Sequence, residues 1–251
     1  MANGESLIWS DFKLFYYLIP TLFSYDAVLI AAAVIPAVFL MIKVYQSDHL
    51  EKETPAFLWK LAKAGIFASL IALVEERILS TILRLFIRDS FLYQVILYFG
   101  IVAVSEESSK YLMLKHHAWN SPEFNCQYDG VVYGVLVSLG FALWENISYV
   151  LSYGFQTALI RAITAIPGHA CFGVFMGVFF GLARTAANRG RENASAGCRI
   201  LAFLVPAFLH GMYDYIATIQ AGDRYFIGFI AIMFIVSLIL IGRMSRDDHY
   251  I

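Results

Sequence analysis

The sequence predicts an all-α membrane protein, a single polytopic bundle of about seven transmembrane helices. Two observations carry this prediction. Of the 251 residues, 60% are hydrophobic and only 15% are charged, whereas soluble domains contain about 45–50% apolar and about 25% charged residues. Long apolar stretches also recur along the chain, and a helix needs about 20 apolar residues to cross the hydrocarbon of a bilayer.

The apolar stretches give the elements in order. We expect spans at residues 26–45, 62–87, 91–114, 129–152, 157–184, 199–218 and 225–242. They form one transmembrane domain over 26–243, followed by a tail at 244–251. Residues 1–25 are aromatic but contain Asp11, Lys13 and Pro20, so we expect an interfacial helix there, with an eighth span as the alternative.

Basic residues predict the orientation, because lysines and arginines concentrate in cytoplasmic loops. Three segments that share one side of seven alternating spans are basic. They contain Lys43, Lys52, Lys60 and Lys63 after the first span, Arg184, Arg189, Arg191 and Arg199 after the fifth, and Arg243 and Arg246 in the tail. We therefore expect a multi-pass protein of the cell membrane, with its N-terminus outside and its C-terminus in the cytoplasm.

Charge and cysteine content exclude two classes of function. The net charge of -1 gives no attraction to nucleic acid. The cysteines, Cys126, Cys171 and Cys198, are odd in number and show no CxxC spacing, which argues against a disulfide framework or a thiolate zinc site.

Small residues recur at a spacing of four in two spans, as Gly130 and Gly134 in the fourth and Gly173, Gly177 and Gly181 in the fifth. Such faces let helix backbones approach closely in lipid. We expect these two spans to pack against each other along the glycines.

Ionisable and polar groups occur inside four predicted spans. They are Glu106, Glu107 and Lys110 in the third span, Glu145 and Asn146 in the fourth, His169 in the fifth, and His210 and Asp214 in the sixth. Each charged group at the centre of a membrane helix costs about 2.5–3.5 kcal/mol on insertion scales, so such residues are functional candidates. The sequence therefore predicts one site at membrane depth, built from four helices.

Two pairs of adjacent glutamates have different local partners. Lys110 follows Glu106 and Glu107 by four and three residues, which places it on their helix face. We expect it to neutralise one carboxylate and leave the other free for chemistry. The second pair, Glu75 and Glu76, is followed directly by Arg77, so we interpret it as an ion-pair cluster rather than a catalytic pair, with a lining of the substrate entry as the alternative.

Carboxylates and histidines together can activate water. A carboxylate takes a proton from water, histidine or asparagine donors stabilise the developing oxyanion, and Asp214 can orient His210. Alternatively, Glu107, His169 and His210 bind zinc and a second glutamate is the base, although the sequence has no HExxH motif. A different class, a proton-coupled transporter or channel, also uses such residues, but its usual repeated halves are missing from this sequence.

Four motifs occur in order, each in a separate span. They are EExxK at 106–110, FxxxEN at 141–146, PGH at 167–169 and HxxxD at 210–214. Within about residues 90–218 the chain resembles the PrsW family of intramembrane proteases, which is related to the CAAX prenyl endopeptidases and the bacteriocin-processing proteases. The resemblance implies an endopeptidase that cleaves membrane-anchored proteins, and one member of the family cuts an anti-sigma factor.

The resemblance also implies roles for individual residues. It makes Glu106 and Glu107 the paired glutamates, one of which activates water, and His169 and His210 the essential histidines. The supporting residues are Lys110, Glu145, Asn146 and Asp214. For the cofactor, a glutamate-activated water without metal is the favoured interpretation, and zinc is the alternative.

Overall fold

The structure is a computed structural model that describes residues 25–219 and 223–251. The interfacial helix or eighth span predicted within residues 1–25 lies almost entirely outside this range. Within the described residues the chain is helical, and the only β contact is an isolated bridge between Cys126 and Tyr250. The all-α prediction is confirmed.

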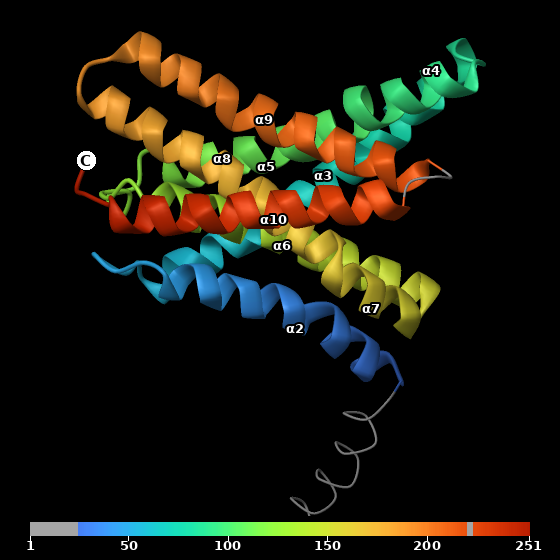
Figure 1. The fold of residues 1–251 in the computed structure, drawn as a ribbon, viewed down its shortest axis with the longest axis horizontal. Helices are drawn as coiled ribbons and strands as arrows, with labels where there is room; N and C mark the ends of the chain where they lie inside the picture. Colours follow the sequence, from blue (N-terminus) through green and yellow to red (C-terminus); the bar gives the residue numbers. More distant parts are fainter. Residues whose placement is uncertain (1–24, 220–222) are drawn as a thin grey trace, which may run out of the picture.

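The helices run side by side along the long axis of the molecule, and the connecting loops lie at its two ends (Figure 1). In chain order they are α2 (Tyr25–Gln46), α3 (Pro55–Phe86), α4 (Ser90–Val95), the π-helical segment η1 (Ile96–Val102), α5 (Ala103–Ala118), α6 (Asp129–Tyr153), α7 (Phe155–Ile163), α8 (Ala165–Asn188), α9 (Glu192–Thr218) and α10 (Asp223–Arg246). The segments α4, η1 and α5 follow one another without a break and together cover the third predicted span, and α7 and α8 together cover the fifth.

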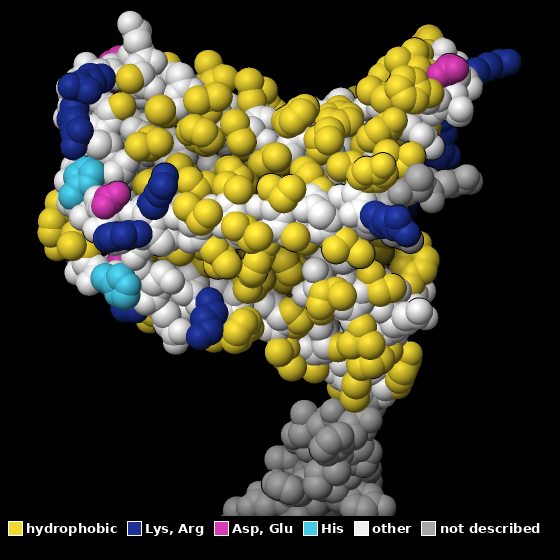
Figure 2. Space-filling model, viewed as in Figure 1, with side chains coloured by type: hydrophobic (Ala, Val, Ile, Leu, Met, Phe, Trp, Pro, Cys, Tyr) yellow, Lys and Arg dark blue, Asp and Glu magenta, His cyan; other side chains and the backbone are white. Residues whose placement is uncertain are grey.

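Six segments of the described chain are long and apolar enough to cross a membrane. The segment from α4 to α5, which holds the third predicted span, is not among these six, so its crossing stays a prediction, as does the orientation of the termini. On the face shown in Figure 2, hydrophobic side chains cover the middle of the molecule, lysines and arginines lie toward both ends, and histidines lie at one end. This distribution is that of a multi-pass membrane protein.

Glycines bring α6 and α8 into backbone contact. A Cβ atom at Gly134 would lie 2.5 Å from the carbonyl oxygen of Gly173, and one at Gly130 would lie 2.6 Å from that of Gly177. These distances leave no room for a side chain, so the predicted glycine packing is confirmed. The contact fixes the distance between the two helices that carry Glu145 and His169.

The predicted span at 157–184 is two helices, because α7 ends at Ile163 and α8 begins at Ala165. Thr164, between them, has φ −120° and ψ −72°. Pro167 explains the break, since a proline ring clashes with the carbonyl four residues earlier, which here is that of Ile163. In the first turn of α8 the same proline is tolerated.

Three segments meet at the end of the bundle where the C-terminus lies (Figure 1). They are the α2–α3 loop (47–54), the α5–α6 loop (119–128) and the chain after α10 (247–251). The tail, predicted from residue 244, begins after Arg246 and docks on the α5–α6 loop, where the Gln127 amide donates to the His249 carbonyl at 3.1 Å. The Thr54 amide and hydroxyl donate to the Glu123 carboxylate at 2.9 Å.

Candidate active site

Two adjacent glutamates of α5 lie in the middle of the bundle. Glu106 is 6% exposed and Glu107 is 0% exposed. Lys110, also fully buried, donates from Nζ to Glu106 Oε2 at 3.1 Å and to Glu107 Oε1 at 2.7 Å. The ammonium therefore contacts both carboxylates, where the sequence predicted that it would neutralise only one.

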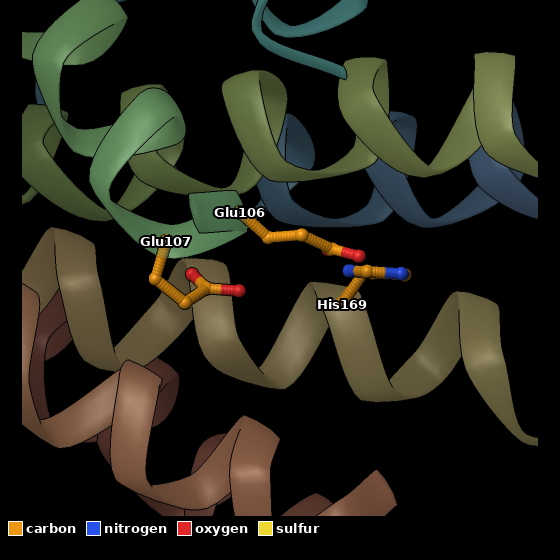
Figure 3. A group of neighbouring side chains, drawn as sticks. All are labelled: Glu106, Glu107 and His169. Atoms are coloured by element: carbon orange, nitrogen blue, oxygen red, sulfur yellow. The ribbon is translucent and has the colours of Figure 1, made fainter. Parts of the chain in front are cut away.

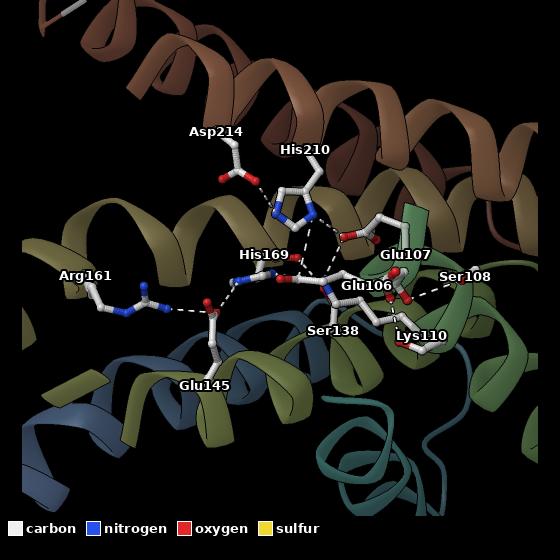
Figure 4. A network of polar contacts seen from close by, with 12 residues as sticks. Glu106, Glu107, Ser108, Lys110, Ser138, Glu145, Arg161, His169, His210 and Asp214 are labelled. Atoms are coloured by element: carbon white, nitrogen blue, oxygen red, sulfur yellow. Dashed lines mark hydrogen bonds and ion pairs between the residues drawn. The ribbon is translucent and has the colours of Figure 1, made fainter. Parts of the chain in front are cut away.

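Lys110 also reaches α8, since its Nζ lies 3.1 Å from His169 Nδ1. An ammonium group can only donate, so Nδ1 accepts and the proton of a neutral His169 is on Nε2. That Nε2 lies 2.9 Å from Glu145 Oε2 on α6. His169 thus links the glutamates of α5 to Glu145, and both of its ring nitrogens are occupied (Figure 4).

His210 enters the cluster from α9. Its Nδ1 donates to Glu107 Oε1 at 2.9 Å and lies 3.8 Å from Glu106 Oε2. Its Nε2 lies 3.6 Å from Asp214 Oδ2, which is too long for a hydrogen bond, so the pairing is electrostatic. The ring stacks on Phe172 with 4.8 Å between the ring centroids, and this contact fixes its orientation.

Arg161, on α7, was not predicted as a site residue. Its Nη2 donates to Glu145 Oε2 at 2.8 Å, and its Nε donates to Asn146 Oδ1 at 2.8 Å. The Asn146 amide donates in turn to the carbonyl of Ala33 on α2 at 2.8 Å. Both ends of this amide are therefore engaged in holding α2, α6 and α7 together. Pro167 is the feature of the sequence from which this contact could have been predicted, because a proline there ends α7 and allows it to lie beside α6.

These residues surround a cavity of about 360 Å³. Its charged and histidine lining includes Glu76, Glu106, Glu145, His169, His210 and Asp214. The structure therefore brings together the predicted residues of four helices. Glu107, Lys110 and Asn146 lie behind this lining rather than on it, since all three are fully buried.

The second glutamate pair contributes to the same cavity. Glu76, on α3, lines it, whereas Glu75 is exposed. Among the described residues, neither glutamate forms an ion pair with Arg77, so the predicted ion-pair cluster is not formed. None of the four motifs lies on this helix, and the packing of α3 beside α5 brings Glu76 to the cavity.

Glu106, Glu107 and His169 have donor atoms of the kinds that zinc binds. One ligand atom from each lies within 4.8 Å of the others, as the convergence in Figure 3 illustrates. In this group Glu106 takes the place that the sequence predicted for His210. The ammonium of Lys110, however, bonds to all three side chains. A dication there would be repelled by it, so the side chains as arranged do not fit a metal ion together with Lys110.

Known proteins resemble this chain over most of its length. The family described as PrsW family intramembrane metalloprotease matches residues 53–241. The protease PrsW of Geobacillus kaustophilus (strain HTA426) is 33% identical over 202 residues, which are 80% of this chain and 84% of that protein. That of Oceanobacillus iheyensis (strain HTE831) is 30% identical over 221 residues, 88% of this chain and 96% of that protein. That of Bacillus subtilis (strain 168) is 40% identical over 121 residues, 48% of this chain and 54% of that protein.

No solved structure matches the chain. The family match covers every helix that lines the cavity, from α3 to α9. The chain belongs to the PrsW family of intramembrane metalloproteases.

Proposed function

We propose that the chain cleaves membrane-anchored proteins with a water molecule that Glu106 activates, while Glu107 holds the surrounding groups in place. One observation carries this division of roles. Glu106 lines the cavity, whereas Glu107 has no exposed surface and bonds to Lys110 and His210. A general base must reach the water from which it takes a proton, and of the two glutamates only Glu106 faces the cavity.

The reaction needs two proton transfers. Glu106 takes a proton from the water as its oxygen attacks the carbonyl carbon of the peptide bond. As the C–N bond breaks, the same carboxyl group gives the proton to the departing amine nitrogen. Microscopic reversibility allows one residue to serve as base and then as acid.

His210 is the donor that we assign to the oxyanion. Its Nδ1 is bonded to Glu107, and as an imidazolium it also donates from Nε2, whose nearest ion partner, Asp214, is 3.6 Å away. A preorganised donor that faces the developing charge contributes most of the stabilisation in such sites. Asn146, the other donor named from the sequence, is bonded to Ala33 and Arg161, so we assign it a positioning role.

A second hollow suggests how a membrane-anchored substrate reaches the site. It has a volume of about 220 Å³, lies between α3 and the α4–η1 segment, and shares Leu73, Glu76 and Val102 with the catalytic cavity. These helices expose apolar side chains such as Phe91 and Leu92. The arrangement supports lateral approach of a substrate segment from the lipid between α3 and η1.

The test is cleavage of a single-span model substrate by the full chain in detergent. Glu106→Gln keeps the shape of the side chain but removes the base, so the turnover rate should fall about 10²- to 10⁴-fold. Capture of uncleaved substrate by this variant should be retained. Glu75→Gln, an exposed acid on α3, is the matched control and should cleave at the wild-type rate. Wild-type turnover in Glu106→Gln would overturn the proposal.

The anti-sigma factor that the resemblance implies as a substrate stays a prediction. A comparison of membrane proteomes from cells that carry the wild type or Glu106→Gln would identify the natural substrate. It should accumulate uncut in the variant.

A further inference from the structure

Carboxylates concentrate at the end of the bundle where the C-terminus lies, far from the catalytic cavity. The residues are Asp48, Glu51, Glu53, Glu123, Asp129 and Asp248. Asp129 begins α6 and Glu145 lies sixteen residues later on that helix, which corresponds to about 24 Å at a rise of 1.5 Å per residue. The proposed peptidase site therefore does not explain this second cluster.

Three of these acids are buried without a matching positive charge. Asp48 and Asp129 are each 1% exposed, and Glu53 is 7% exposed. No hydrogen bond of normal geometry reaches a carboxylate oxygen of Asp48 or of Glu53, although the backbone amides of Leu50 and Glu51 favour the Asp48 carboxylate and the Tyr133 hydroxyl favours that of Glu53. Asp129 Oδ2 accepts from the backbone amides of Asn125 and Cys126, at 3.0 Å and 2.7 Å. Buried charges that lack partners are strongly unfavourable.

The nearby lysine, Lys52, offsets this negative charge only in part. Lys52 borders the cluster, but its ammonium donates to the Tyr45 carbonyl at 3.2 Å and lies over the Tyr45 ring at 4.2 Å. Asp248 adds negative charge beside Asp48. Burial raises the pKa of Asp48, and it raises the pKa of Glu53 to about 7, because the negative form of each carboxyl group is poorly solvated there.

The spacing of the oxygens fits a cation. One ligand atom each from Asp48, Glu53 and Asp129 lies within 4.8 Å of the others. Calcium–oxygen bonds of about 2.3–2.6 Å separate two oxygens on opposite sides of the ion by about 4.6–5.2 Å. An adjoining hollow of about 70 Å³ is also lined by Glu51, Glu123 and Asn125. At about 30 Å³ per water, it has room for about two water ligands.

We propose that Asp48, Glu53 and Asp129 bind a hard divalent cation of the Ca²⁺ or Mg²⁺ class. Such ions take carboxylate and water oxygens, which this site supplies. The ion joins the α2–α3 loop to the start of α6. The tail backs the site, because Asp248 Oδ1 accepts from the Tyr128 amide at 2.8 Å. The cation therefore joins two chain segments, with the tail docked beside them, at one end of the bundle and independently of peptide hydrolysis.

Calorimetric titration of the full chain in detergent with CaCl₂ or MgCl₂, after chelator treatment, tests this site. The wild type should bind one ion per chain at this site. Asp48→Asn and Glu53→Gln should each raise the dissociation constant about tenfold or more, since loss even of outer-shell partners costs about 10- to 100-fold. Glu192→Gln, an exposed acid at the start of α9, should bind as the wild type does.

Folding is checked in parallel by thermal unfolding. Without cation, Asp48→Asn should unfold at the wild-type temperature or above it, because a repulsive charge is removed. Added cation should raise this temperature in the wild type and not in the variant. Comparison of CaCl₂ with MgCl₂ shows which ion binds more tightly. Weaker binding, or a smaller rise in the unfolding temperature with added cation, in Asp48→Asn supports the site. The proposal is overturned if the wild type binds neither ion, or if Asp48→Asn and Glu53→Gln bind the ion with the affinity of the wild type.

Discussion

Replacement of Lys110 by methionine tests the centre of the catalytic cluster. The substitution keeps an unbranched side chain and removes the ammonium that lies 3.1 Å from Glu106, 2.7 Å from Glu107 and 3.1 Å from His169. At an effective dielectric constant of about 20, each ion pair at such distances is worth about 5–6 kcal/mol before desolvation is subtracted. Breaking a buried pair costs about 3–5 kcal/mol net, because the partner charge is left buried and unpaired.

Lys110→Met should therefore lower the free energy of unfolding by about 3–5 kcal/mol. The measurement is denaturant unfolding of the full chain in detergent, followed by tryptophan fluorescence. Lys115→Met, an exposed lysine five residues later on α5, is the matched control and should change stability by less than about 0.5 kcal/mol. The double variant Lys110→Met/Glu107→Gln should recover part of the loss, because both partners of one buried pair are then neutral. Equal effects of Lys110→Met and Lys115→Met would refute the reasoning.

Two further predictions follow from the arrangement of the site and from the helix contact beneath it. Because the Lys110 ammonium lies among the three candidate zinc ligands, wild-type turnover should persist in excess chelator, whereas loss of turnover that added zinc restores would contradict this interpretation. A Cβ at Gly134 would lie 2.5 Å from the Gly173 carbonyl oxygen, so Gly134→Ala should lower the free energy of unfolding by about 1–3 kcal/mol. Gly197→Ala on α9, where nothing lies within 4 Å, should be neutral or raise it by up to about 1 kcal/mol, and a loss equal to that of Gly134→Ala would contradict the packing argument.

The sequence predicted the helices and most of the cavity because lipid imposes simple rules on both. A span must be long and apolar, so its position can be read from composition. A charged group in such a span is costly, so Glu106, His169 and His210 stood out from their surroundings. Glycines at a spacing of four lie on one face of a helix and allow close backbone approach in lipid, so they predicted the α6–α8 contact.

The roles within the cluster depended on packing that the sequence does not encode locally. Adjacent residues of a helix point about 100° apart, so which of Glu106 and Glu107 faces the cavity is decided by the helices around α5. The contact of Lys110 with His169 on α8 could not be predicted for the same reason. In the sequence, Arg161 is a charged residue near the end of a predicted span. In the structure, the break at Thr164 lets α7 bring it beside Glu145.

The acidic cluster escaped prediction for a different reason. Asp48 and Glu53 lie in a loop, where water normally solvates charged side chains, so the sequence offered no reason to predict a site there. Asp129 is about eighty residues away along the chain. Only the docking of the α5–α6 loop and the tail shows that these acids are buried together.

The break at Thr164 uncouples the rotation of α7 from that of α8 within one predicted span. In a continuous helix, one inserted residue turns everything beyond it by about 100° and shifts it by about 1.5 Å. Since the helical geometry stops at Thr164, a change in the length of α7 is not transmitted to His169. An insertion between His169 and Gly173 would instead rotate the imidazole away from Lys110 while the glycines hold α8 against α6. An insertion between Arg161 and Thr164 therefore leaves His169 in place, whereas one between His169 and Gly173 is incompatible with the site.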